Sequence, residues 1–342
     1  MTDPLPPGER ATTLSEVARV AGVSLATASK AINGRADVAE RTRRRILDVA
    51  ERLHFTPNPM ARGLLTHRTS TVGLLTSDLE GRFVLPILMG AEDAFGAGKV
   101  SVFLCDARGD AIREQYHLKA LLSRRVDGII VVGRQTDPRP SIGREFPVPV
   151  VYAYAPSMNP ADTSLTPDNE AGGRLVVEHL VNCGRTRIAH ITGDRTYAAA
   201  QDRVVGINDA LAAQGLGLVG APMYSEWSER WGRNATAVLL ERHPEVDAII
   251  CGSDQIARGT LDTLRSAGRS VPEDVAVISF DNWQVLATNA RPELTTVDFN
   301  LEQLGRTAAR FLLNAMGEHK LAPGTHRLPV SLVIRGSTIA QR

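Results

Sequence analysis

The stretch that decides the fold is "TLSEVARVAGVSLATASKAING", residues 13–34, which predicts two short helices joined by a glycine turn. Thr13 and Glu16 have the spacing of a capping box, in which each side chain bonds the other residue's backbone N–H. Gly22 ends a run of apolar residues at helical spacing, namely Leu14, Val17, Ala18 and Ala21. The sequence therefore predicts a first helix that begins after Thr13 and stops at Gly22.

The second helix is expected to begin after Ser24, whose hydroxyl is a typical N-cap, with Val23 as the buried residue of the turn. Its apolar face consists of Ala28, Ala31 and Ile32, and its other face carries Leu25, Ala26, Thr27, Ser29 and Lys30. Because most of these outward side chains are short, the helix can lie close to base edges in a DNA major groove.

These residues, followed by "VAERTRRRILDVAERLHFTPNPMARGLL" at 38–65, resemble the DNA-binding headpiece of the lactose-repressor (LacI/GalR) family of transcriptional regulators. The rest of the chain resembles the effector core of the same family. The structural alternative is an ordinary helical hairpin packed on a larger domain.

The resemblance implies roles in DNA binding. Direct base contacts are expected from Leu25, Ala26 and Lys30, because lysine can donate to guanine and small apolar side chains suit the thymine methyl. Phosphate contacts, which set register without reading sequence, are expected from Ser24, Thr27, Ser29, Asn33, Thr42, Arg43 and Asn58. The run "RTRRR" at 41–45 also fits a solvated helix face.

Residues 58–70 are predicted to be a hinge helix and linker. Asn58 suits a helix cap and Pro59 the first helical position, which favours a short helix over 59–65. So short a helix is marginal alone, so its folding is expected to wait for DNA and the partner subunit's copy. By resemblance, the hinge residues Pro59, Met60, Ala61 and Arg62 enter the minor groove, and Leu64 is the wedge that unstacks the central base step. A flexible linker with an exposed leucine is the alternative.

Charge is distributed unevenly behind a net value of +1. Residues 1–70 hold 11 lysines and arginines against 7 acidic side chains, whereas the remainder holds 28 against 31. Only the N-terminal part is therefore suited to phosphates. We expect a disordered N-terminal arm at 1–12 and a helix-turn-helix headpiece at 13–57.

Beyond residue 70, strands alternate with helices, which indicates α/β lobes with parallel sheets. The first lobe has predicted strands "TVGLL" (71–75), "VSVFLC" (100–105), "VDGIIVVG" (126–133) and "VPVVYA" (148–153). A Pro-rich stretch at 156–167 follows, and the alternation restarts with a helix at 169–182. The resemblance implies a two-lobed, periplasmic-binding-protein-like core at 71–342, with an N-lobe of about 71–158 and 294–322 and a C-lobe of about 159–293 and 323–342.

The resemblance also places an effector between the lobes, near Phe83, Arg203, Trp227, Asp254 and Asp281. A guanidinium fork suits vicinal hydroxyls or a carboxylate, an aspartate at a strand's carboxyl end suits hydroxyls, and an indole offers a flat face for a pyranose. Each residue also has a structural alternative: Arg203 in an ion pair, Trp227 in the core, and Asp254 as a helix cap.

The effector is expected to be a mono- or oligosaccharide that releases the protein from a palindromic operator. Two positions depart from the lactose-type members, Tyr154 in place of an acid and Ser253 in place of an asparagine, so galactoside specificity is not expected. An effector-promoted regulator with a purine or other metabolite as ligand, and a stand-alone sugar-binding protein, are the alternatives.

No enzyme activity, metal or cofactor is expected. "GLGLVG" at 215–220 fits a dinucleotide fingerprint, but it follows a predicted helix and precedes a strand, the reverse of the required order. The three cysteines, Cys105, Cys183 and Cys251, have no metal-ligand spacing. Without a long apolar run, a soluble cytoplasmic protein that associates with the nucleoid is expected. Because no heptad tail precedes Arg342, a homodimer is expected rather than a dimer of dimers.

Overall fold

The computed structural model describes residues 12–32, 34–35, 37–55, 68–96, 100–143, 146–317 and 320–339. The chain divides into two units, Met1–Thr69 and Ser70–Arg342. Several predictions lie outside the described residues: most of the N-terminal arm and the roles of Asn33, Asn58, Pro59, Met60, Ala61, Arg62 and Leu64.

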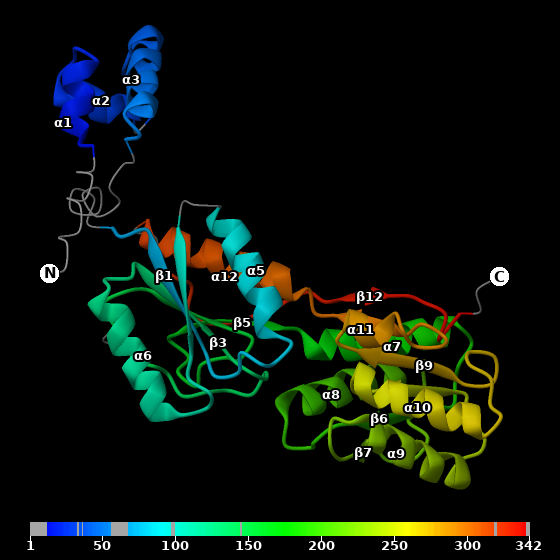
Figure 1. The fold of residues 1–342 in the computed structure, drawn as a ribbon. Coiled ribbons are helices and arrows are strands. Elements are labelled where there is room, and N and C mark those ends of the chain that lie inside the picture. Colours follow the sequence, from blue (N-terminus) through cyan, green and yellow to red (C-terminus); the bar gives the residue numbers. More distant parts are fainter. Residues whose placement is uncertain are drawn as a thin grey trace, which may run out of the picture. The chain divides into compact units, whose positions relative to one another are not determined.

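The first unit contains the helices α1 (Leu14–Val20), α2 (Leu25–Ile32) and α3 (Glu40–Arg52), drawn in blue in Figure 1. The capping box predicted at Thr13 is confirmed, since the Thr13 hydroxyl accepts from the Glu16 N–H while the Glu16 carboxylate accepts from the Thr13 N–H. Val17, Ala28 and Ile46, one from each helix, are fully buried together. Val23 was predicted to be buried in the turn, but it is only half-buried, against the same cluster.

The first lobe of the second unit is built on a parallel six-stranded sheet of order β11-β5-β4-β3-β1-β2. Its strands are β1 (Thr71–Thr76), β2 (Ser101–Asp106), β3 (Gly128–Val132), β4 (Val150–Ala153), β5 (Thr163–Pro167) and β11 (Gly324–Leu328). Side chains of β1 and β3 alternate between two apolar clusters. Helices α5 (Val84–Phe95) and α12 (Leu301–Met316) cover one face of the sheet, and α6 (Ala111–Ser123) covers the other.

The second lobe has a six-stranded sheet of order β12-β10-β9-β8-β6-β7, parallel except for β12. Its strands are β6 (Ile188–Thr192), β7 (Met223–Tyr224), β8 (Ala248–Cys251), β9 (Ala276–Phe280), β10 (Thr295–Asp298) and β12 (Ser331–Val333). Helices α7 (Asn169–Asn182) and α8 (Ala198–Ala213) cover one face, while α9 (Glu229–Arg242) and α10 (Asp254–Ser266) cover the other; α11 (Gln284–Ala287) is a single turn.

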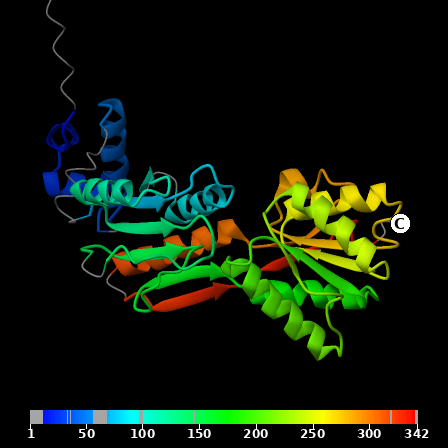
Figure 2. The ribbon, with the colours of Figure 1, turned by 90° about the horizontal axis from the view of Figure 1, so that it is seen from below.

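The chain passes between the lobes three times, after β5, after β10 and after β11 (Figure 2). The predicted lobe boundaries at 158, 294 and 322 were therefore wrong. β5 and β11 pair with each other in the first sheet, and β10 pairs with β9 in the second. The predicted fold class, a small all-α helix-turn-helix headpiece followed by a two-lobed α/β core, is confirmed.

Candidate functional site

The outward face of α2 exposes the three residues predicted to contact bases. Leu25 is 51% exposed, and Ala26 and Lys30 are also exposed. The predicted cap at Ser24 is present, because its hydroxyl accepts from the Thr27 N–H at 3.1 Å and lies 2.8 Å from the Thr27 hydroxyl.

Lys30 is not directed freely into solvent. Its ammonium lies 2.6 Å from the carboxylate of Asp37, across the turn that follows α2. The hydrogen bond from Lys30 lowers the pKa of Asp37 below its ordinary value. The predicted base contact of Lys30 would require its ammonium to leave this carboxylate.

The arginines of α3 differ in exposure. Arg43 has only 22% of its side chain exposed and donates to the backbone carbonyl of Arg35, so part of its guanidinium is used within the unit. Arg44 is 77% exposed, with its Nε 3.3 Å from Glu40 Oε1. Arg43 is the residue predicted to contact phosphate, but Arg44 is the more accessible cation of the two.

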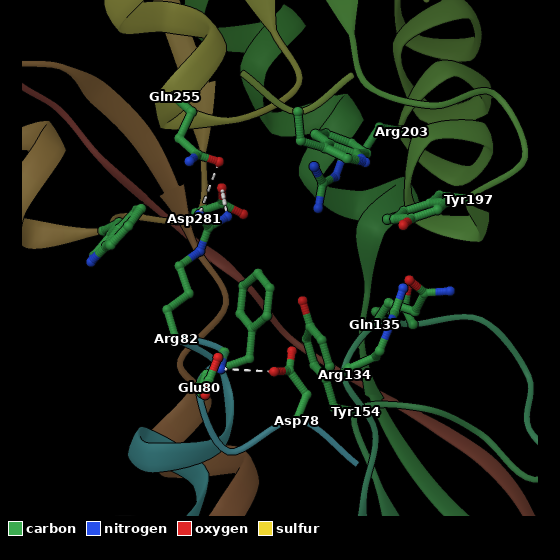
Figure 3. A pocket seen from close by; sticks show the side chains of 16 residues that line it. Asp78, Glu80, Arg82, Arg134, Gln135, Tyr154, Tyr197, Arg203, Gln255 and Asp281 are labelled. Carbon is green, nitrogen blue, oxygen red and sulfur yellow. Dashed lines mark hydrogen bonds and ion pairs between the residues drawn. The ribbon is translucent and has the colours of Figure 1, made fainter. Parts of the chain in front are cut away.

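A cavity of about 380 Å³ lies between the two lobes of the second unit (Figure 3). It contains four of the five predicted effector residues, namely Phe83, Arg203, Trp227 and Asp281. The further polar and aromatic residues in its lining are Asp78, Glu80, Arg82, Arg134, Gln135, Thr136, Tyr154, Tyr197, Gln255 and Trp283. Many of them follow the carboxyl ends of strands, where ligands bind in open α/β sheets. The preference of ligands for the carboxyl ends of strands can be applied to a sequence, but it does not indicate which residues of each loop face the cavity.

Arg203, in the second turn of α8, is fixed by its own lobe. Its Nε donates to Asn169 Oδ1 at 2.9 Å and its Nη1 to the Gly252 carbonyl at 2.5 Å. The guanidinium also lies over the rings of Phe280 and Phe299, at 4.6 and 5.0 Å from the centroids. Burial lowers the pKa of Arg203, which is only 3% exposed. Its Nη2 has no hydrogen-bond partner within the described part of the chain, so one donor of the fork remains for a ligand.

Asp281 follows β9 and has a left-handed backbone with φ of 108°, which is costly for a residue with a Cβ. Its side chain is 3% exposed and forms an ion pair with Arg82 of the other lobe. Burial raises the pKa of Asp281, and the neighbouring Arg82 and Arg203 lower it. Figure 3 shows Arg82 reaching from the first lobe towards Asp281 and Gln255.

Arg82 was not among the predicted site residues. Its guanidinium lies between two aromatic rings, 4.6 Å from the centroid of Phe83 and 4.8 Å from that of Trp283. In this structure Arg82 is bound to the carboxylate of Asp281, the group that was predicted to bind an effector. No spacing in the sequence indicates that a residue of the first loop should pair with one 199 positions later.

The prediction that Asp254 contacts the effector is not supported. Asp254 is fully buried at the start of α10 and is absent from the cavity lining. Its carboxylate accepts from the Ser279 hydroxyl, the Thr296 hydroxyl and the Trp283 N–H, at 2.6, 2.8 and 2.6 Å. Burial, and the nearby charge of Asp281, raise the pKa of Asp254 to about 7. The residue thus supports the loop of Asp281 and Trp283 from behind; the helix cap itself is Ser253.

Aromatic rings line both sides of the cavity. Phe83 stacks on Tyr154 with 4.8 Å between centroids, and Tyr197 is tilted against Trp227 at 5.9 Å. The indole of Trp227 packs so closely on Gly193 that a Cβ at that position would collide with the ring. The buried Nε1 of Trp227 has no hydrogen-bond partner in the described residues. The cavity therefore combines flat apolar faces with donors and acceptors.

Comparisons with known proteins agree with this architecture. Residues 13–58 match the family model of bacterial regulatory proteins, lacI family, and residues 177–338 match a periplasmic binding protein-like domain. The chain is 32% identical over 329 residues to catabolite control protein A of Priestia megaterium, covering 95% of this chain and 99% of that protein.

Two solved structures are similar along most of the chain. The transcriptional regulator CelR–cellobiose complex shares 30% identity, covers 95% of this chain and 99% of its own, and has a TM-score of 0.63. The lac repressor dimer bound to operator and the anti-inducer ONPF shares 27% identity over 97% of this chain and 100% of its own, with a TM-score of 0.73. Among the described residues, no helix has the length and hydrophobicity needed to cross a bilayer.

Proposed function

This chain belongs to the lacI family of bacterial regulatory proteins, and we propose that it is a sequence-specific transcriptional repressor whose operator affinity is controlled by a sugar. The observation that supports this most directly is that one chain holds both an exposed α2 face and an interlobe cavity. The cavity presents a fixed guanidinium, a buried carboxylate and aromatic rings. A stand-alone sugar-binding protein has no use for the first of these two sites.

In the proposed DNA complex, α2 lies in the major groove with Leu25, Ala26 and Lys30 at the base edges. The phosphate contacts are those predicted from the sequence, from Ser24, Thr27, Ser29, Asn33, Thr42, Arg43 and Asn58, to which the structure adds Arg44 as an accessible cation. The hinge at Pro59, Met60, Ala61 and Arg62 and the Leu64 wedge belong to the same proposal. Two copies form a homodimer on a palindromic operator, in the cytoplasm at the nucleoid.

The chemistry of the cavity favours a neutral polyhydroxylated ligand. Trp227 and Tyr197 offer ring faces for a pyranose, and Phe83 adds an apolar side chain to the lining. Arg203 Nη2 and the carboxylate of Asp281 are a donor and an acceptor for hydroxyls. The complex of the similar regulator CelR with cellobiose supports the same class of ligand. An effector that binds Asp281 must share this carboxylate with Arg82 or displace Arg82 from it.

The proposal is tested in two steps. A thermal-shift screen of mono- and disaccharides, purines and amino acids identifies the effector, since a ligand at a hundredfold excess over Kd stabilises by about 2.7 kcal/mol. Fluorescence anisotropy on operator selected from random duplexes then measures affinity with and without the hit. Sugar-induced release is expected. Tighter binding with a purine or another metabolite would instead identify a corepressor-type regulator, and no DNA binding at all would leave only a sugar-binding protein.

A further inference from the structure

Asp137, in the loop after β3 of the first lobe, reaches the second lobe. Its Oδ1 accepts a hydrogen bond from the backbone N–H of Ala198, the first residue of α8, at 3.0 Å. Within α8 itself, the N-cap residue Tyr197 makes no side-chain capping bond and the first turn contains no acid. The first N–H groups of a helix otherwise lack partners and favour a negative charge.

The loop that carries Asp137 is fixed to the first lobe two residues later. Arg139 Nη2 lies 2.7 Å from Glu114 Oε1 of α6, and both side chains are mostly buried. The backbone of Arg139 also donates to the Pro156 carbonyl and accepts from the Met158 N–H, each at 2.8 Å. Asp137 therefore moves with the first lobe, and its bond to Ala198 breaks when the lobes separate.

The start of α8 places several groups around the effector cavity. Tyr197 and Ala199 line the cavity directly, and Arg203 follows one turn later. A separate cross-lobe contact, the ion pair of Arg82 with Asp281, uses a carboxylate that the proposed effector needs. The hydrogen bond of Asp137 to Ala198 uses none of the groups that are proposed to contact the effector. This bond can therefore persist when the effector is bound.

We propose that Asp137 is a positioning residue that caps α8 across the cleft, and that this cap favours the closed lobes and holds the first turn of α8, with Tyr197, in place for the effector. The effect on α8 stands on the geometry alone, and the effect on ligand affinity rests on the proposed function. If only the closed form binds the effector, the apparent affinity is the affinity of the closed form multiplied by the fraction of molecules that are closed. A variant that opens the lobes therefore binds more weakly.

The test uses the full-length protein and the variants Asp137→Ala and Asp137→Asn. Hydrogen exchange of the segment 197–203 is measured without ligand, and cellobiose binding is measured by calorimetry. Asp137→Ala is expected to speed exchange in this segment and to raise the Kd by about 2- to 30-fold, the range that a lost N-cap corresponds to. Asp137→Asn, which keeps an acceptor oxygen, is expected to stay near wild type in both.

Asp110→Ala is the matched control. Asp110 caps α6 inside the first lobe by accepting from the N–H groups of Ile112 and Arg113, at 2.7 and 3.0 Å. Its loss is expected to lower the melting temperature without changing exchange at 197–203 or cellobiose affinity. Unchanged exchange in Asp137→Ala, or equal effects in both alanine variants, overturns the proposal. If cellobiose does not bind the wild type, that choice of sugar fails, while the exchange measurement still decides the role of Asp137.

Discussion

Lys30 and Asp37 form an ion pair between exposed side chains, and such pairs contribute little to stability. Lys30 can therefore leave Asp37 at small cost when a guanine is available. We expect Lys30→Ala to relax the preference at one symmetric base pair and to cost about 1–3 kcal/mol per half-site. Binding to duplexes that vary at this position measures the effect; an equal loss on all duplexes would show that Lys30 contacts phosphate only.

Asp254 makes the stability of the second lobe depend on pH. Its pKa is about 7 in the folded protein against an ordinary value of 3.8, so the folded state holds the proton more tightly. The stabilisation from this carboxyl is complete below about pH 4 and is lost as the pH rises through about 7. The melting temperature of Asp254→Asn relative to wild type is therefore expected to increase between pH 5 and pH 8. A difference that stays constant with pH would contradict this account.

His190 acts in the opposite direction in the same lobe. Its Nδ1 lies 2.8 Å from the Ile250 carbonyl, and burial lowers its pKa to about 4 from an ordinary 6.5. The neutral ring is favoured in the folded state, so this stabilisation is present above about pH 6.5 and is lost towards pH 4. Comparing Asp254→Asn with wild type at each pH cancels the contribution of His190.

Helix pairs of the core meet through glycines. A Cβ on Gly206 of α8 would collide with the Glu170 carbonyl of α7, and Gly173 of α7 meets the Arg203 carbonyl in the same way. The pairs Gly90 with Gly305 and Gly232 with Gly259 join α5 to α12 and α9 to α10 by the same device. In each pair two backbones approach more closely than any side chain permits.

Gly206→Ala is expected to destabilise the protein by about 1–3 kcal/mol, because backbone atoms cannot move aside as a side chain can. Gly217→Ala is the matched control, since a Cβ there meets nothing within 4 Å and the residue is exposed. Chemical denaturation measures both variants. Equal stability of the two would show that α7 and α8 can separate without cost.

Secondary structure was predictable where hydrophobic periodicity is strong, as for α7, whose predicted bounds agree with the structure. β5 was missed because "TSLTP" is polar and ends in proline, although all five residues are buried between β4 and β11. The Thr163 hydroxyl donates to the Ala322 carbonyl at 2.7 Å, and the Ser164 hydroxyl accepts from the Ser157 N–H at 3.0 Å. The sequence shows polarity but not these partners, and the lobe boundary at 158 was misplaced with β5.

The same limit applies to the cavity. The family resemblance indicated Arg203, Trp227 and Asp281, which line the cavity, and each of them has a chemistry that suits a ligand by itself. The roles of Asp254 and Arg82 depend on which residues of other elements lie beside them, and no local pattern reports that. A carboxylate in a strand-end loop can face the cavity or support it from behind.

The molecule as a whole is expected to couple the cavity to the operator. Effector binding that alters the lobes would change the separation of the two hinges in a dimer, and a coupling of about 1–3 kcal/mol changes occupancy 5- to 150-fold. Arg203→Lys keeps the charge but cannot bond Asn169 and a ligand together through one planar fork. We expect this variant to weaken effector binding by about 1.5–3 kcal/mol while operator affinity without effector stays at the wild-type value.

Operator titrations by anisotropy, with and without the sugar found in the thermal-shift screen, measure both quantities in one series. Arg174→Lys is the control, because Arg174 lies outside the cavity lining and is 40% exposed, with its Nη1 4.0 Å from Glu170. The sugar is expected to release the Arg174→Lys variant from the operator at the same concentration as the wild type. If Arg203→Lys also loses operator affinity in the absence of sugar, Arg203 supports the arrangement of the lobes themselves, since it joins α7, α8 and the loop after β8. Release of Arg203→Lys at the wild-type sugar concentration would instead remove Arg203 from the effector site.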